Sequence, residues 1–235
     1  MLVAAAVCPC PPLLVPDVAA GAAPELDAAR TACADALGVL AAARPDLVVV
    51  LGPAEQDGRG PHFAGATGSF HGFGVDLEVR LGAGRAQERP LPPSLAVGAW
   101  LLTRVQWADG PVEGLGVGEL LAAERCEALG RELAARAERV ALLVMGDGSA
   151  CRTLKAPGYL DERAADFDAQ TARALSAADV GALKALDESL AYELKAAGRA
   201  PWQVLAGAAE TAGLAGQLLY EDAPYGVGYF VAAWS

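Results

Sequence analysis

The sequence predicts an α/β protein, a three-layer α/β/α sandwich around a mixed, mainly parallel sheet, in a single domain over residues 1–235. Apolar runs with the length of buried strands, Leu47–Leu51 and Val140–Met145, each end in a Gly-containing loop. Amphipathic segments with helical spacing lie between the predicted strands. The composition is 54% hydrophobic, and no linker or internal repeat divides the chain. Strands that alternate with helices favour a parallel sheet covered on both faces.

The first half of the chain begins as a strand, a loop and a helix. Residues 1–7 form an apolar run, and a Pro-rich loop separates it from a helical pattern over about 24–43. The continuous apolar stretch Pro45–Pro53 predicts an interior strand. Residues 54–73 are rich in glycine and have no hydrophobic period, so we expect a long loop there. A half-buried strand over 74–82 and a helix over 91–105 complete this half.

The second half repeats the alternation. A strand over 112–117, a helix over 119–136 and an apolar strand within 138–152 come first. Asp179 is expected to cap a helix over 179–197, and Gly198 is expected to end it. The remaining elements are a helix over 161–174, a helix over 202–212 and two antiparallel strands within 216–234.

Charge and composition narrow the classes of partner. The formal net charge is −11, and no cluster of Lys or Arg stands out, so neither nucleic acid nor an anionic membrane is an expected partner. No apolar run reaches the roughly 20 residues that a bilayer span needs. The first apolar segment lacks a basic stretch before it and is interrupted by prolines, which argues against a signal peptide. The five cysteines are odd in number and scattered, as reduced thiols are, so we expect a cytoplasmic protein.

Three loops should meet beyond the carboxyl ends of the parallel strands, where pockets form in such sheets: residues 8–16, 53–74 and 146–158. Their motifs are "CPCPPLLVP", "DLVVVLGPAEQ" and "VMGDGSACRTLKAPGYLDERAADFD". In this order, and with the closing "YEDAPYGVGYFVA", they resemble the LigB-like superfamily. That superfamily contains the catalytic subunits of class III extradiol ring-cleavage dioxygenases and the Memo proteins. The resemblance runs from the first strand to the last and implies the same α/β/α fold.

The resemblance also implies a non-haem Fe(II) site, which these dioxygenases build from two histidines and a carboxylate. The first ligand histidine corresponds to Cys10 and the second to Ala54, while the third ligand falls at about Ala196 or Ala197. The acid/base histidine corresponds to Ala150 or Cys151. An alanine methyl group neither coordinates a metal nor moves a proton. The resemblance therefore implies a relative that has lost iron and ring cleavage, with no cofactor and with a pocket that binds a small molecule or a protein.

Other residues offer an alternative chemistry at the same strand ends. Cys10, Glu55, Asp147 and Cys151 are all expected near them, and two thiolates with two carboxylates form a donor set that zinc accepts. This alternative is a metal-dependent oxidoreductase or hydrolase. The cysteine spacing is C-x-C, without a second pair, so the pattern is also that of buried small hydrophobic residues. A further alternative is a nucleophilic Cys10 or Cys151, which needs a lowered thiol pKa.

The two histidines and Asp147 can also be interpreted without a catalytic role. His62 and His71 are nine positions apart in the glycine-rich loop, and solvated loop histidines are the default expectation. His71, beside two phenylalanines, is expected to line the mouth of the mapped pocket. Asp147 follows an apolar strand and precedes Gly148, so its carboxylate either has a chemical role or caps the local turn.

Overall fold

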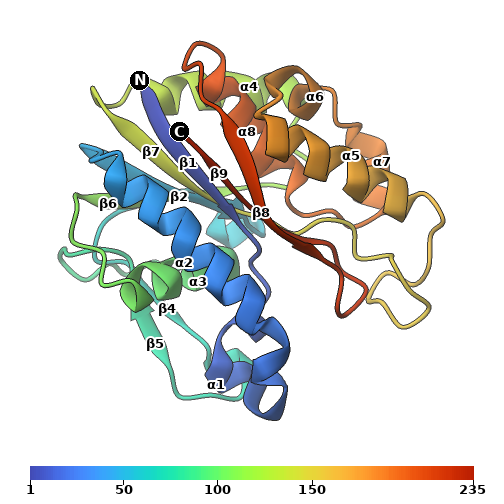
Figure 1. The fold of residues 1–235 in the computed structure, drawn as a ribbon. Helices are drawn as coiled ribbons and strands as arrows, with labels where there is room; N and C mark the ends of the chain where they lie inside the picture. Colours follow the sequence, from blue (N-terminus) through green and yellow to red (C-terminus); the bar gives the residue numbers. More distant parts are fainter.

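A mixed seven-stranded sheet forms the centre of the computed structural model, which describes residues 1–235. The strand order is β3-β6-β2-β7-β1-β9-β8 (Figure 1). Four neighbouring strands are parallel: β6 (Val112–Val117), β2 (Leu47–Pro53), β7 (Val140–Met145) and β1 (Leu2–Cys8). Three strands make antiparallel pairs: β3 (Gly60–His62) with β6, β9 (Tyr229–Trp234) with β1, and β8 (Gly216–Asp222) with β9. The predicted fold class is confirmed.

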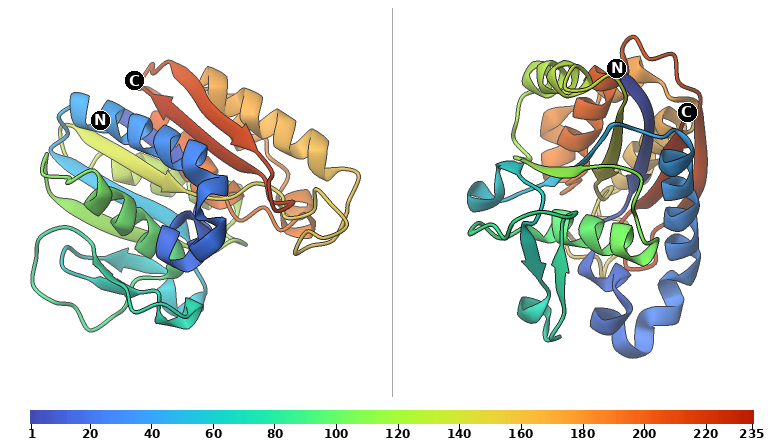
Figure 2. Two further views of the ribbon diagram at one scale, coloured as in Figure 1. Left: turned by 60° about the horizontal axis from the view of Figure 1, so that its bottom comes forward. Right: turned by 90° about the vertical axis from the view of Figure 1, so that its left-hand side faces the viewer.

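Helices cover both faces of this sheet (Figure 2). One face carries α2 (Asp27–Ala42) and α3 (Pro93–Arg104), with the short α1 (Pro16–Ala19). The opposite face carries five helices: α4 (Ala123–Ala134), α5 (Ala164–Ala177), α6 (Val180–Lys184), α7 (Glu188–Glu193) and α8 (Arg199–Ala209). A separate two-stranded sheet of β4 (Thr67–Ser69) and β5 (Glu78–Arg80) packs beside α3.

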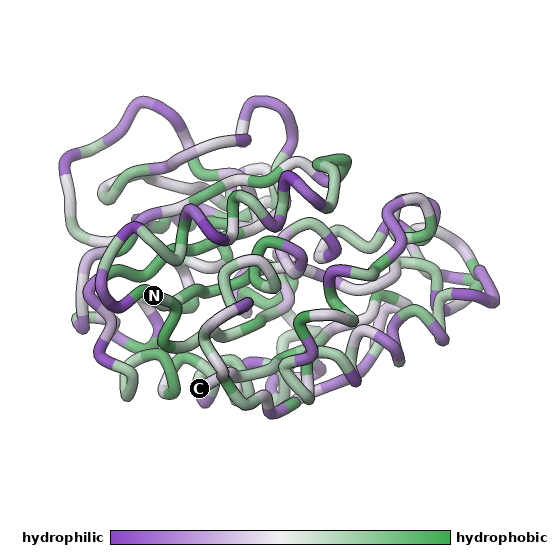
Figure 3. Tube along the Cα trace, turned by 90° about the horizontal axis from the view of Figure 1, so that it is seen from above, coloured by the Kyte–Doolittle hydropathy of each residue, from purple (hydrophilic) through white to green (hydrophobic).

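The side chains of the central strands alternate between two hydrophobic cores. In β1, Ala5 and Val7 point into the core under α4–α8, whereas Ala4, Ala6 and Cys8 point into the core under α2 and α3. This alternation follows from the two-residue period of a strand. Both faces of these strands are buried, which explains their continuous apolar sequences. Figure 3 shows the hydrophobic residues concentrated inside and the hydrophilic residues on the outer loops.

Close contact between α4 and α8 depends on two glycines. A Cβ on Gly130 would lie 2.1 Å from the carbonyl oxygen of Val204, and one on Gly207 would lie 2.2 Å from that of Glu127. Only a residue without a side chain permits this backbone approach. None of the helices in the structure has the length and the apolar character that a membrane span requires.

The structure corrects four expected details. Residues 54–73 are not one loop, because β3 pairs with the edge of the main sheet and β4 with β5. The strand expected over 74–82 is only β5, outside the main sheet. The helix expected over 179–197 is divided into α6 and α7, because Asp187 accepts a hydrogen bond from Leu190 N–H and caps a new helix. Asp179 caps α6 as predicted, but Gly198 precedes α8 and ends no helix.

Candidate functional site

Cys10 and Asp147 lie together at the carboxyl ends of β1 and β7. The two strands are parallel neighbours in which Cys8 pairs with Met145, so the residues two positions further along both chains emerge side by side. The main-chain N–H of Cys10 donates a 2.8 Å hydrogen bond to Oδ1 of Asp147. The Asp147 carboxylate thus accepts a hydrogen bond from the main chain, as the turn-capping interpretation predicted. The donor, however, belongs to the loop after β1 and not to the turn that contains Asp147.

Burial controls the protonation of this pair. Desolvation raises the pKa of Asp147 to about 7, although hydrogen bonds from Cys10 oppose the shift. Burial, and after it the charge of Asp147, raises the pKa of the Cys10 thiol well above its usual value. Burial likewise raises the pKa of Tyr229, and the charges of Asp147 and Cys10 add to this effect. Asp147 is therefore partly protonated at neutral pH, where an exposed carboxyl would have lost its proton.

A second buried carboxylate, that of Asp168 on α5, organises the loop after β7. It accepts hydrogen bonds from Ser149 N–H and Ser149 Oγ, each 2.8 Å long, and an ion pair of 3.0 Å from Arg152. Asp168 itself is completely buried. No role was predicted for Asp168 from the sequence. Its helical spacing with Phe167, Thr171 and Leu175, which form the buried face of α5, was the feature that could have indicated its burial.

The alanines at the mapped ligand positions are packed into the protein. The N–H of Ala54 donates to the carbonyl of Val117, and its methyl group fills the space beside Gly58 and Gly116. The N–H of Ala150 donates to the carbonyl of Leu194 over 2.9 Å. Ala196 is buried and Ala197 is partly buried in the turn between α7 and α8. The side chains at these positions are methyl groups, and the main-chain N–H groups of Ala54 and Ala150 are engaged in the hydrogen bonds given above. None of these side chains can coordinate a metal.

The expected four-residue donor set is not gathered at one point. Glu55 is exposed at the surface after β2. Cys151 belongs to the core under α4–α8, with its Sγ 3.5 Å from the carbonyl oxygen of Leu194, whereas Cys10 belongs to the opposite core. No group of three or more His, Cys, Asp or Glu side chains is placed to hold a metal ion. The structure thus brings together only Cys10 and Asp147.

The thiols do not have the properties of activated nucleophiles. All five cysteines are buried and free of disulfides. Burial raises the pKa of Cys151, as it does that of Cys10, and Asp161 and Asp168 add to the shift more than the nearby Lys195 and Arg163 oppose it. A nucleophilic cysteine requires the opposite shift.

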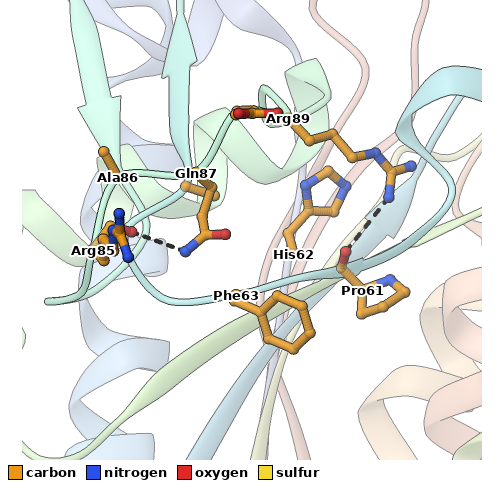
Figure 4. A pocket seen from close by; sticks show the side chains of 9 residues that line it. Pro61, His62, Phe63, Arg85, Ala86, Gln87 and Arg89 are labelled. Atoms are coloured by element: carbon orange, nitrogen blue, oxygen red, sulfur yellow. Dashed lines mark hydrogen bonds between the residues drawn. The ribbon is translucent and has the colours of Figure 1, made fainter.

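The two histidines lie in different environments, and only His71 is the solvated histidine that the default expectation describes. His62 is 2% exposed on β3, and its Nε2 donates to the carbonyl of Gly58 over 2.9 Å, which leaves Nδ1 as a buried acceptor without a partner. Figure 4 shows it between Gln87 and Arg89 in a cavity of about 650 Å³. His71 is instead at the surface, where its Nε2 lies 2.6 Å from Asp76. It lines none of the five main cavities, so the expected place at a pocket mouth is not observed.

The main cavity near the strand ends lies beside the mapped residues. It is lined by residues of the loop after β7, starting with Arg152 directly after Cys151, and by residues of the β8–β9 turn. Its volume is about 730 Å³. We call it the Arg152 cavity. Its wall is formed by Arg152, Thr153, Leu154, Lys155, Leu160, Pro224, Tyr225 and Gly226. Cys10, Ala54 and Asp147 line none of the five main cavities, because packed side chains fill the mapped centre.

Comparison with known proteins relates the chain by fold. No protein-family model and no curated protein matches it. Its fold is similar to that in the crystal structure of the uncharacterized protein JW3007 from Escherichia coli K12, with a TM-score of 0.56 and 15% sequence identity over 99% of both chains. The whole length of the chain therefore follows one known α/β architecture.

Proposed function

We propose that this chain is a LigB-like protein that has lost the non-haem iron site and ring cleavage and serves as a noncatalytic binding protein. The proposal rests on one observation. At the carboxyl edge of the sheet, where the resemblance places the iron ligands, the structure has the partly buried Cys10–Asp147 contact and packed alanines.

The residues present do not fit Fe(II). A facial triad needs three donors around one point and open positions for substrate and oxygen. Ala54 and Ala196 supply methyl groups, and the thiol of Cys10 keeps its proton at neutral pH because burial raises its pKa. A thiol must lose that proton before it binds a metal. Asp147 is the carboxylate that is hydrogen-bonded to Cys10, and one carboxylate does not make a triad.

The adjacency of Cys10 and Asp147 favours a second candidate, a metal-dependent oxidoreductase or hydrolase. A metal such as zinc would have to deprotonate both side chains and recruit further donors. Glu55 would then have to turn inward from the surface, and Cys151 would have to leave its core. The binding function requires no such rearrangement, so it is the better-supported proposal.

An oxygen-uptake assay tests the proposal. The protein is incubated anaerobically with Fe(II), and air-saturated buffer containing catechol or 3,4-dihydroxybenzoate is then added. We expect oxygen consumption equal to that of Fe(II) without protein and no ring-opened product. Protein-dependent uptake with an equivalent amount of ring-opened product would overturn the proposal. Loss of that activity in Cys10→Ser and Asp147→Asn would then assign it to the second candidate.

A further inference from the structure

We infer that the Arg152 cavity is a binding site for a small organic anion, a carboxylate or a phosphate monoester, that carries an apolar chain or ring. The loop after β7 runs beside the β8–β9 turn (Figure 1). Residues of these two segments line the cavity, which lies outside the mapped iron centre. The site would therefore exist whether or not the protein binds iron.

The guanidinium group of Arg152 is held in place from the protein interior. One of its nitrogens, Nη1, is 3.0 Å from Oδ2 of the buried Asp168, which the hydrogen bonds from Ser149 fix in turn. The guanidinium makes no other hydrogen bond, and the side chain is 31% exposed. A planar arginine that is oriented by one edge and has free N–H donors is suited to binding carboxylate or phosphate oxygens.

Lys155 supplies the net positive charge of the cavity. Asp168 balances the charge of Arg152, but Lys155 takes part in no ion pair and is exposed. No acidic side chain lines the cavity, although the chain has 29 acidic and only 18 basic residues. A concave surface that carries one unpaired cation, and a second cation paired with a buried carboxylate, attracts anions against the overall negative charge of the protein.

Most of the rest of the wall is apolar. Leu154 and Leu160 are 62% and 45% exposed, and Pro224 and Tyr225 line the same cavity from the β8–β9 turn. The main-chain N–H of Arg152 donates to the carbonyl of Gly226 over 3.0 Å and joins the two loops. A ligand with an apolar body would cover these leucines and bind more tightly as more of its CH₂ groups are buried.

Calorimetric titration with four probes tests the inference. Hexanoate and hexyl phosphate combine an anion with an apolar chain, whereas hexanol lacks the charge and inorganic phosphate lacks the chain. We expect saturable one-to-one binding of at least one hexyl anion, and at least tenfold weaker binding of hexanol and of inorganic phosphate. The stronger of the two hexyl anions identifies the preferred head group. Absence of saturable binding for both, or equal binding of hexanol, would overturn the inference.

Two variants assign the binding to this cavity. Lys155→Gln changes an exposed side chain and is expected to weaken the binding of the hexyl anion by about fivefold, the loss of roughly 1 kcal/mol for one partly exposed charge. Lys195→Gln is the matched control, because Lys195 is also exposed and unpaired but does not line the cavity. Equal affinities of the Lys155→Gln, Lys195→Gln and unmodified proteins would contradict the inference. Neither variant touches the Cys10–Asp147 pair, so this result is independent of iron binding.

Discussion

The main-chain N–H of Cys10 donates a 2.8 Å hydrogen bond to Oδ1 of Asp147, although 137 residues separate them in the chain. The parallel register of β1 and β7 creates this contact. It occupies the edge of the sheet at which proteins with this architecture usually bind ligands. Here the edge is occupied by the buried Cys10 and the partly buried carboxyl of Asp147, and the lining of the Arg152 cavity starts at the residue after Cys151.

The partly buried carboxyl of Asp147 should make the protein less stable as the pH rises. Its pKa is about 7 in the folded protein, against 3.8 for an ordinary aspartate, so the folded state binds more protons between these two values. We expect Asp147→Asn, which keeps the acceptor for Cys10 N–H, to stabilise the protein by about 2–3 kcal/mol more at pH 9 than at pH 5, because the folded carboxyl loses its proton between these two pH values. Urea unfolding at both pH values measures this. An equal effect at pH 5 and pH 9 would contradict it.

Removing the carboxylate of Asp168 should be strongly destabilising. Asp168→Ala would leave the hydroxyl and N–H of Ser149 without their acceptor and Arg152 without its counter-ion. Breaking a buried ion pair from one side costs about 3–5 kcal/mol. Asp161→Ala, which removes a partly exposed carboxylate paired with Arg163, should cost much less. Chemical denaturation of both variants tests the contrast, and similar losses would show that the network around Asp168 is not structural.

His62 should make the protein sensitive to mild acid. Desolvation, and the charge of Arg89 with it, lowers the pKa of His62 below 6.5 despite the hydrogen bond to Gly58. The unfolded state therefore binds the proton first, and stability is complete above pH 6.5 and falls as the pH decreases below it. The free energy of unfolding between pH 7.5 and 5 should fall less in His62→Gln than in the unmodified protein. An equal fall in the two proteins would disprove this assignment.

Two glycines in helices should respond oppositely to alanine. Gly130→Ala forces a methyl group against the α8 backbone and should destabilise the protein by about 1–3 kcal/mol. Gly38→Ala in α2 meets no atom within 4 Å and should stabilise it by up to ~1 kcal/mol through helix propensity. Thermal unfolding compares them. A gain in stability for Gly130→Ala would mean that α4 and α8 are not as close as the structure describes.

The sequence was most informative where hydrophobic periodicity is strong. The strand expected over 112–117 coincides with β6, and the closing strands pair antiparallel as predicted. The adjacency of Cys10 and Asp147 was predictable because parallel strands end at one edge. The side of the sheet on which Cys151 is buried was not predictable, because it depends on the path of an irregular loop. The burial of His62 was also missed, since β3 is three residues long and has no apolar alternation.

Metal content after loading tests the central claim, the loss of the iron site, most directly. The purified protein is incubated anaerobically with Fe(II), and in parallel with Zn(II), then desalted and examined by elemental analysis. We expect far less than one equivalent of either metal in the unmodified protein, and the same metal content in the Cys10→Ser variant. Near-stoichiometric metal that disappears in Cys10→Ser would contradict it and would identify Cys10 as a ligand of a rebuilt centre.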